Sequence, residues 1–260
     1  MTKYPSIDLT YLIKLIADLR GANGCPWDKQ QTHESLKRYL LEESYEVLDS
    51  IDRNKKGLAE ELGDVLLQIL FHSQIASEKG EFTIDDVLET LGRKLIQRHP
   101  HVFGKDTVKD AGEVEARWEQ IKQENKPDGD TPSILAGIPS SMPALAQSQL
   151  MQERASRNGF DWDEIDGVLD KVREEIQEIK EAKSKQEKIA ELGDLFFSLV
   201  NVSRWMGIQA EDSMRQANSR FNSRFSRMEE LAKYKGASFS ELRQVEKQEL
   251  WEQAKILERS

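Results

Sequence analysis

The chain has 260 residues, enough for one or two domains, and its 37 Lys and Arg against 47 Asp and Glu give a formal net charge of −10. This acidity excludes a general duplex-binding protein, but small anionic substrates stay possible because a bound cation can reverse the local field. Cys25 is the single cysteine, which excludes a disulfide framework and a cysteine-based zinc site. No signal peptide or membrane-spanning run is expected, so we predict a cytoplasmic protein that binds no membrane and no nucleic acid polymer.

The first half of the chain is expected to be helical throughout. Apolar residues recur there at helical spacing, and Gly, Pro and Asn mark the turns. Thr83 with Asp86 forms a capping-box pattern, Gly21–Asp28 breaks the first helix, and Pro100 is expected to stop the fourth. The predicted helices are Ile7–Arg20, Thr32–Asp52, Leu58–Glu78, Thr83–Arg98 and Glu113–Glu124.

A linker is predicted over Asn125–Pro143, which holds four of the seven prolines. It separates a first domain, 1–124, from a second, 144–260. Ser238 with Glu241 is a second capping-box pattern and predicts the start of the last helix, which carries Trp251. The other helices predicted for the second half are Pro143–Asn158, Glu164–Lys183, Gln186–Met206 and Glu211–Leu231, with a break at Gly159–Asp163.

Both halves carry the same acidic pattern, EExxE followed by ExxD. The gap is 14 residues after Glu46 and 12 residues after Glu178. Carboxylates three residues apart share a helix face, and a short turn makes consecutive helices antiparallel, so four carboxylates can meet at one point in each half. A lone pattern of this kind is usually a solvated face, but its recurrence favours a hard divalent cation, Mg²⁺ or Mn²⁺, which would relieve the repulsion.

The two halves also match outside the acidic pattern. NGCPWD at 23–28 corresponds to NGFDWD at 158–163, and WEQIK at 118–122 corresponds to WEQAK at 251–255. Lys94 and Arg98 stand opposite Arg220 and Arg224 when the halves are aligned. We therefore predict an all-α protein made of a duplicated helical-bundle domain.

The acidic pattern resembles the signature of the all-α nucleoside triphosphate pyrophosphohydrolases. Together with GCPWD, RHPHVF and RWEQIK, the duplicated form resembles the MazG family from about Leu12 to Leu257. The resemblance implies tandem MazG-like domains in a homodimer. It implies Mg²⁺-dependent hydrolysis of ribo- and deoxynucleoside triphosphates of many bases between the α and β phosphates, which gives the monophosphate and pyrophosphate.

Residue roles carry over from this resemblance. The implied metal ligands are Glu43, Glu46, Glu61 and Asp64 in the first half and Glu175, Glu178, Glu191 and Asp194 in the second. The implied nucleotide contacts are Lys171, Glu175, Lys188, Asp194, Arg220, Arg224 and Trp251. Arg220 and Arg224 share a helix face and could grip phosphate, or else face solvent or a second subunit. Trp251 could stack on a base, or else belong to the core.

A catalytic hypothesis follows for the second half. A metal-bound or carboxylate-held water attacks the α-phosphorus in line, and Glu174, next to the catalytic ligand Glu175, positions or deprotonates it. The alternative role for Glu174 is a supporting or surface carboxylate. Lys171 and Lys188 correspond to Tyr39 and Leu58 in the first half, which favours the second half as the main catalytic unit.

Two other functions stay open on the sequence. One is a narrower pyrophosphohydrolase with a selective base pocket; the other is a non-catalytic helical dimer that binds a nucleotide or a partner protein. The chain has no P-loop or GxGxxG motif, and its four histidines form no ExxH pattern, so other nucleotide and di-iron sites are not indicated.

Overall fold

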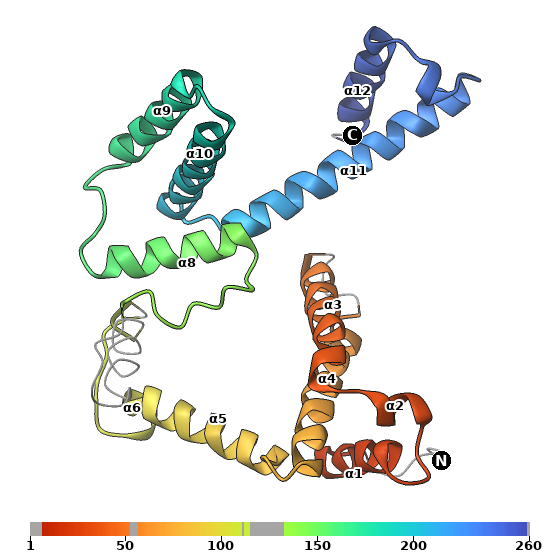
Figure 1. The fold of residues 1–260 in the computed structure, drawn as a ribbon, viewed down its shortest axis with the longest axis vertical. Coiled ribbons are helices and arrows are strands. Elements are labelled where there is room, and N and C mark those ends of the chain that lie inside the picture. The colour runs from red at the N-terminus through yellow and green to blue at the C-terminus, as the bar shows by residue number, and fades with distance from the viewer. Residues whose placement is uncertain (1–6, 53–56, 111, 115–132, 259–260) are drawn as a thin grey trace. The chain divides into compact units, whose positions relative to one another are not determined.

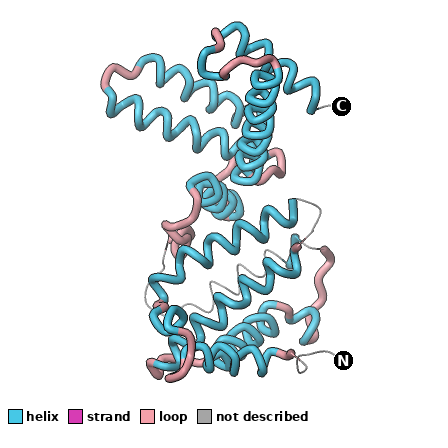
Figure 2. Tube along the Cα trace, turned by 90° about the vertical axis from the view of Figure 1, so that its right-hand side faces the viewer, coloured by secondary structure: helices cyan, strands magenta, loops and turns pink. Residues whose placement is uncertain are grey.

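A computed structural model describes residues 7–52, 57–110, 112–114 and 133–258, and its helices are shown in Figures 1 and 2. The all-α prediction is confirmed, since the described ranges contain helices and turns but no strand. The chain divides into two compact units, Met1–Asp128 and Gly129–Ser260. The predicted boundaries at 124 and 144 stay a prediction. No helix in the described ranges is long and apolar enough to span a membrane.

The first unit contains six described helices. They are α1 (Leu9–Arg20), α2 (Pro26–Gln30), α3 (His33–Asp52), α4 (Leu58–Glu78), α5 (Ile84–Arg98) and α6 (Pro100–Phe103). The capping box of Thr83 and Asp86 is present at the start of α5. The predicted end of the first helix before Gly21 and the predicted stop of the fourth before Pro100 are both confirmed. Two short helices were not predicted: α2 begins at Pro26 inside the break and runs to Gln30, and α6 begins at Pro100, because proline is well tolerated at the first position of a helix. The predicted helix Glu113–Glu124 lies largely outside the described residues.

The described part of the second unit contains five α-helices and one 3₁₀ turn. They are α8 (Ala144–Arg157), α9 (Ile165–Glu181), α10 (Lys185–Trp205), α11 (Ala210–Tyr234), η1 (Phe239–Glu241) and α12 (Gln244–Glu258). The predicted capping box at Ser238 is wrong. The Ser238 side chain makes no capping bond, its hydroxyl lies 2.9 Å from that of Ser240, and the α-helix begins only at Gln244. Of the predicted linker, residues 125–132 lie outside the described ranges.

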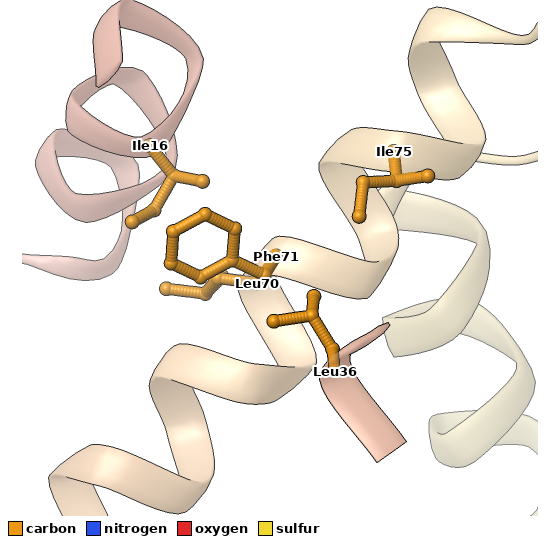
Figure 3. Close-up of a cluster of buried hydrophobic side chains, with 5 residues drawn as sticks. All are labelled: Ile16, Leu36, Leu70, Phe71 and Ile75. Carbon is orange, nitrogen blue, oxygen red and sulfur yellow. The ribbon is translucent and has the colours of Figure 1, made fainter. Parts of the chain in front are cut away.

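The core of the first unit lies where α1 packs against the α3–α4 hairpin. Figure 3 shows Ile16 of α1 beside Phe71 of α4, with Leu36 of α3 on the other side. Arg20 fixes the edge of this core, since it pairs with Glu78 of α4 at 2.8 Å and donates to the carbonyl oxygens of Asp28 in α2 and of Gln31 just after it. The acidic hairpin of this unit therefore rests on a packed apolar base.

Buried glutamines of α8 hold the second unit together. The Gln149 side chain accepts a hydrogen bond of 2.7 Å from the backbone N–H of Ala210, an otherwise unpaired donor at the start of α11. The Gln152 amide donates to the Phe197 carbonyl of α10 at 2.8 Å. In Figure 1, α8 crosses the end of the α9–α10 hairpin from which α11 departs, and α12 folds back along α11.

We predict that Leu36→Ala destabilises the first unit by about 2–5 kcal/mol, because Leu36 is only 1% exposed and its truncation leaves a cavity. Denaturant unfolding of the full chain, followed by hydrogen exchange in α3 and α4, measures this change. The matched control is Lys37→Ala at the exposed neighbouring position, for which we expect a change within about 0.5 kcal/mol. Equal effects of the two substitutions would contradict this assignment of the core.

Candidate metal centre and active site

Each acidic pattern lies on a helical hairpin, as the sequence predicts. In the first unit the hairpin is α3–α4, and in the second it is α9–α10; these are the two most extensively packed pairs among the described helices. The second hairpin turns within three residues, and Ser184 and Glu187 form a capping box at the start of α10 that the sequence analysis did not identify. The short turn makes the helices antiparallel and brings their acidic faces together.

Three carboxylates of the second unit converge on one point. Ligand atoms of Glu175, Glu178 and Glu191 all lie within 4.8 Å of one another. Glu175 is only 3% exposed, and its Oε2 atom is buried with no hydrogen-bond partner among the described residues. An unpaired anionic oxygen in a buried position is unfavourable, and a divalent cation with oxygen ligands would satisfy it. The donor set therefore fits Mg²⁺ or Mn²⁺.

The first unit repeats this arrangement with Glu43, Glu46 and Glu61, whose ligand atoms also lie within 4.8 Å of one another. Burial raises the pKa of Glu43, and the neighbouring charges of Asp64 and Glu46 raise it further. The pKa of Glu61 is raised for the same reasons, by burial and then by Glu46. The part of each shift that comes from neighbouring carboxylates reflects their mutual repulsion, which either protons or a cation can relieve.

The fourth predicted ligand lies outside the group of three in each half. Asp64 and Asp194 stand one helical turn after Glu61 and Glu191. Asp64 still acts on the first group, because its charge raises the pKa of Glu43 and Glu61. Asp194 has the matching place on α10. The structure thus brings together three of the four predicted ligands in each unit and places the fourth on the same helix.

Lys171 is the cation that partly balances the second group. Its Nζ atom lies 2.7 Å from Glu175 and 2.9 Å from Glu174, and these carboxylates raise the lysine pKa. Burial and the Glu175 charge raise the pKa of Glu178, while Lys171 lowers it. In the first unit Tyr39 takes the place of this lysine and packs against the core beside the Trp27 ring. Only the second hairpin therefore carries an internal ammonium at this position.

The remaining predicted contacts fall into two places. Lys188 is exposed in the first turn of α10, and it makes no ion pair with any described residue. Arg220 is exposed on α11, and Arg224 pairs with Glu258 at 2.7 Å while lying 5.6 Å from the centre of the Trp251 ring. Trp251 packs against the core between α11 and α12, so the core alternative holds for part of its surface.

The predicted residues therefore form two separate groups within the described part of the second unit. One is the acidic group with Lys171, on α9 and α10. The other is the Arg224–Trp251 pair, on α11 and α12. None of the described hydrogen bonds or ion pairs joins these two groups. Glu174 is exposed and bonded to Lys171, which is compatible with either of its two predicted roles.

The turn before α9 is fixed by a network centred on Asp161, which the sequence analysis did not identify. Its carboxylate accepts hydrogen bonds from the Arg204 guanidinium, from the Ser156 hydroxyl at 2.6 Å and from the Trp205 indole at 3.1 Å. Burial raises the pKa of Asp161, but these bonds outweigh it and hold the pKa well below its ordinary range. The recurring NG–WD motif marks the turn, but nothing in the sequence spacing links it to Arg204.

Comparison with known proteins finds one family model that matches in each half of the chain. The family model described as the MazG nucleotide pyrophosphohydrolase domain matches residues 31–103, which include the first acidic group. The model described as phosphoribosyl-ATP pyrophosphohydrolase matches residues 146–221, which include the second. The two matches together cover both helical hairpins.

Full-length relatives support the same grouping. The chain is 46% identical to a Thermotoga maritima protein named nucleoside triphosphate pyrophosphohydrolase/pyrophosphatase MazG, over 94% of each chain. It is 42% identical to an Escherichia coli K12 protein named nucleoside triphosphate pyrophosphohydrolase, over 94% of this chain and 95% of the relative. It is 43% identical to the Bacillus subtilis protein YabN, of which it covers 51%.

We predict that Asp161→Asn destabilises the second unit by about 3 kcal/mol at pH 7, because it leaves the largely buried Arg204 without its counter-charge. The folded pKa of Asp161 is depressed, so its contribution is present above the unfolded pKa of about 4 and is lost as the pH falls toward the folded pKa. The difference in the free energy of unfolding between parent and variant, measured with urea, should therefore be smaller at pH 3 than at pH 7. Asp163→Asn, in the same turn, is the control. A difference between parent and Asp161→Asn that is independent of pH would contradict the assignment.

Proposed function

Because the chain belongs to the MazG family of nucleotide pyrophosphohydrolases, we propose that it hydrolyses ribo- and deoxynucleoside triphosphates between the α and β phosphates, with Mg²⁺ and with little preference for the base. The products are the nucleoside monophosphate and pyrophosphate, and the cytoplasm is the proposed location. The observation that carries this proposal is the buried Glu175, whose unpaired Oε2 atom lies in a group of three convergent carboxylates. The names of the full-length relatives support the same reaction.

Glu175, Glu178 and Glu191 would hold the ion, with Asp194 beside them. Mg²⁺ bound there would neutralise the charge that moves toward the leaving pyrophosphate. Lys171, which already faces this group, can turn from Glu175 toward a phosphate oxygen once the carboxylate has a metal partner. Glu174 is exposed at the edge of the group, where it can orient the attacking water or accept its proton.

Exposed cations are proposed to bind the remaining phosphate charge. Lys188 follows the hairpin turn on α10 without an ion-pair partner among the described residues, and Arg220 is exposed on α11. Arg224 is held by Glu258 and by the Trp251 ring, so its guanidinium is oriented before any ligand binds. Because Arg224 and Trp251 lie on a different pair of helices from the acidic group, we propose that a second copy of the chain supplies these two contacts.

We propose that the second unit is the main catalytic unit. It combines the acidic group with Lys171 and Lys188, whereas Tyr39 in the first unit is packed against the core and supplies no charge. The first unit keeps its own three carboxylates and can hold a metal.

A homodimer is proposed from an apolar stripe on α10. The side chains that form it recur at intervals of three and four residues, which is the spacing of a helix-packing seam. They are the exposed Ile189, Leu192, Phe196 and Leu199, with exposed fractions of 57%, 44%, 51% and 45%. A second copy would bury them, since water-exposed stripes of this kind mark interaction surfaces.

We predict Mg²⁺-dependent release of pyrophosphate from a panel of nucleoside triphosphates. Glu175→Gln should lower kcat/KM by about a hundredfold or more, because it removes a buried metal ligand. Glu43→Gln should have a much smaller effect if the second unit is the main catalyst. The matched control is Asp170→Asn, at an exposed carboxylate of the same helix. Near-parental turnover by Glu175→Gln would refute the site, and release of phosphate in place of pyrophosphate would refute the cleavage position.

We predict that sedimentation at assay concentration gives a mass of about twice the 29.9 kDa of one chain. Phe196→Glu should shift the protein toward the single-chain mass, because it places a charge in the middle of the proposed seam. Tyr234→Glu, at the exposed tyrosine that ends α11, tests whether the effect is specific to this stripe. A parent protein that sediments at the mass of one chain would contradict the homodimer.

A further inference from the structure

The first unit contains a pair of histidines that the acidic group does not account for. His33 is the first residue of α3, and His72 lies opposite it on α4. Their Nδ1 atoms are 2.7 Å apart, and the rings are stacked with centroids 5.1 Å apart and an interplanar angle of 2°. Since this distance is that of a hydrogen bond, one Nδ1 atom carries a hydrogen and the other accepts it. The pair therefore joins the two helices at the end of the hairpin away from its turn.

This hydrogen bond needs one Nδ1 atom without a hydrogen. A neutral pair meets that condition, and so does a pair that has taken up one proton, because a neutral imidazole keeps one bare ring nitrogen. When both imidazoles are protonated, two donors and two positive charges face each other across 2.7 Å. We propose that the pair makes the first unit sensitive to acid: it joins α3 to α4 until the second proton binds, and it then drives the two helices apart.

The surroundings of His72 oppose that second proton. Its Nε2 atom is buried with no hydrogen-bond partner among the described residues, so a protonated ring would carry a buried N–H without an acceptor. Burial lowers the pKa of His72, and the charge of His33 lowers it further. The folded state thus binds this proton less well than the unfolded chain does. Stability is therefore lost as the pH falls from the ordinary histidine pKa of about 6.5 toward the folded pKa of His72.

Charged groups of the elements around the pair lie outside this response. Burial and His33 cause the shift in the His72 pKa, and the neighbouring charges do not contribute to it. Those charges include Arg20 of α1, Asp28 of α2, Glu34 and Lys37 of α3, Glu78 of α4 and Asp86 of α5. Arg20 pairs with Glu78, and Lys37 pairs with Glu34. Hydrogen bonds from Arg20 and from Thr83 lower the pKa values of Glu78 and Asp86, so these carboxylates lose their charge only in stronger acid.

The acidic group on the same hairpin responds to acid in the opposite direction. The pKa values of Glu43 and Glu61 are raised, so the folded state takes up protons there more readily than the unfolded chain and is stabilised as the pH falls. His33 lies ten residues before Glu43, about 15 Å along α3, and so does not contact that group. A loss of stability between pH 6.5 and pH 5.5 therefore distinguishes the histidine pair from the carboxylates.

The second unit provides an internal comparison. When the acidic patterns are aligned, Ile165 stands in place of His33 and Val202 in place of His72. Ile165 is likewise the first residue of its helix, and Val202 lies on α10. Neither side chain takes up a proton, so this kind of hairpin forms without a histidine pair. The α9–α10 hairpin should consequently lack this response to acid.

The test measures hydrogen exchange in the full chain at pH 7.5 and at pH 5.5, with a chelator present to remove divalent cations. The protection of α3 and α4 is expressed relative to that of α9 and α10 in the same sample, after correction for the intrinsic exchange rate at each pH. We expect this relative protection to fall several-fold, up to about tenfold, because one additional proton on the unfolded chain changes the equilibrium up to tenfold per pH unit.

Substitutions at the pair isolate its contribution. His33→Ile/His72→Val reproduces the side chains of the second unit and should abolish the fall in protection. His72→Gln keeps a polar side chain that takes up no proton, so it should abolish the fall as well, and it covers the case in which the apolar double variant fails to fold. His101→Gln, which removes a histidine of α6, is the matched control and should keep the fall.

Three results would overturn the proposal. Equal relative protection of the parent at the two pH values would show that a second proton does not separate α3 from α4. A fall that persists in both His33→Ile/His72→Val and His72→Gln would show that acid acts at another group, and so would a fall that His101→Gln abolishes. The measurement involves no nucleotide, so its outcome is independent of the proposed function.

Discussion

Repulsion among carboxylates is the constraint on which the rest of this structure depends. Three acidic side chains held within 4.8 Å of one another, with Glu175 removed from water, oppose folding unless a counter-charge is present. The same unfavourable grouping of three carboxylates occurs in each unit. Each acidic hairpin is consequently braced by uncharged packing: the core around Phe71 in the first unit and the α8 glutamines in the second. The scaffold holds the charges together so that a cation can bind them without further rearrangement.

The two buried glutamines of α8 join this helix to α11 and to α10 in different ways. Gln149 satisfies an N–H at the start of α11, while Gln152 uses only half of its amide to hold α10. A buried amide whose nitrogen is hydrogen-bonded but whose oxygen has no partner among the described residues is energetically unfavourable. Gln152 also lines a cavity that Trp162 and Lys171 line, so one side chain both joins α8 to α10 and forms part of the cavity wall.

The sequence predicted the fold well where a periodic pattern or a local motif existed. Helical spacing predicted α3, α4, α9 and α10 within a few residues, and the recurrence of the acidic pattern predicted which faces meet. It failed at Ser238, because the serine and glutamate spacing of a capping box also occurs in a 3₁₀ turn, where the backbone carbonyl accepts the bond. It did not find the link between Asp161 and Arg204, since 43 residues separate them and only the tertiary fold brings them together. The unpaired oxygens of Glu175 and Gln152 could not be predicted from the sequence either, because the burial of a side chain depends on every element packed around it.

The ion pair between Lys171 and Glu175 would make two binding events interdependent. A divalent ion held by Glu175 would take the place of the ammonium and release one positive charge beside the acidic group. That charge would then be available to an anionic ligand, which would keep the ammonium away from the carboxylate. Linkage of this kind is reciprocal, so the ion and the phosphate chain would each raise the affinity for the other by the same factor. The first hairpin has Tyr39 at this position and would lack this cooperativity, so the duplicated halves would respond to the same ion in different ways.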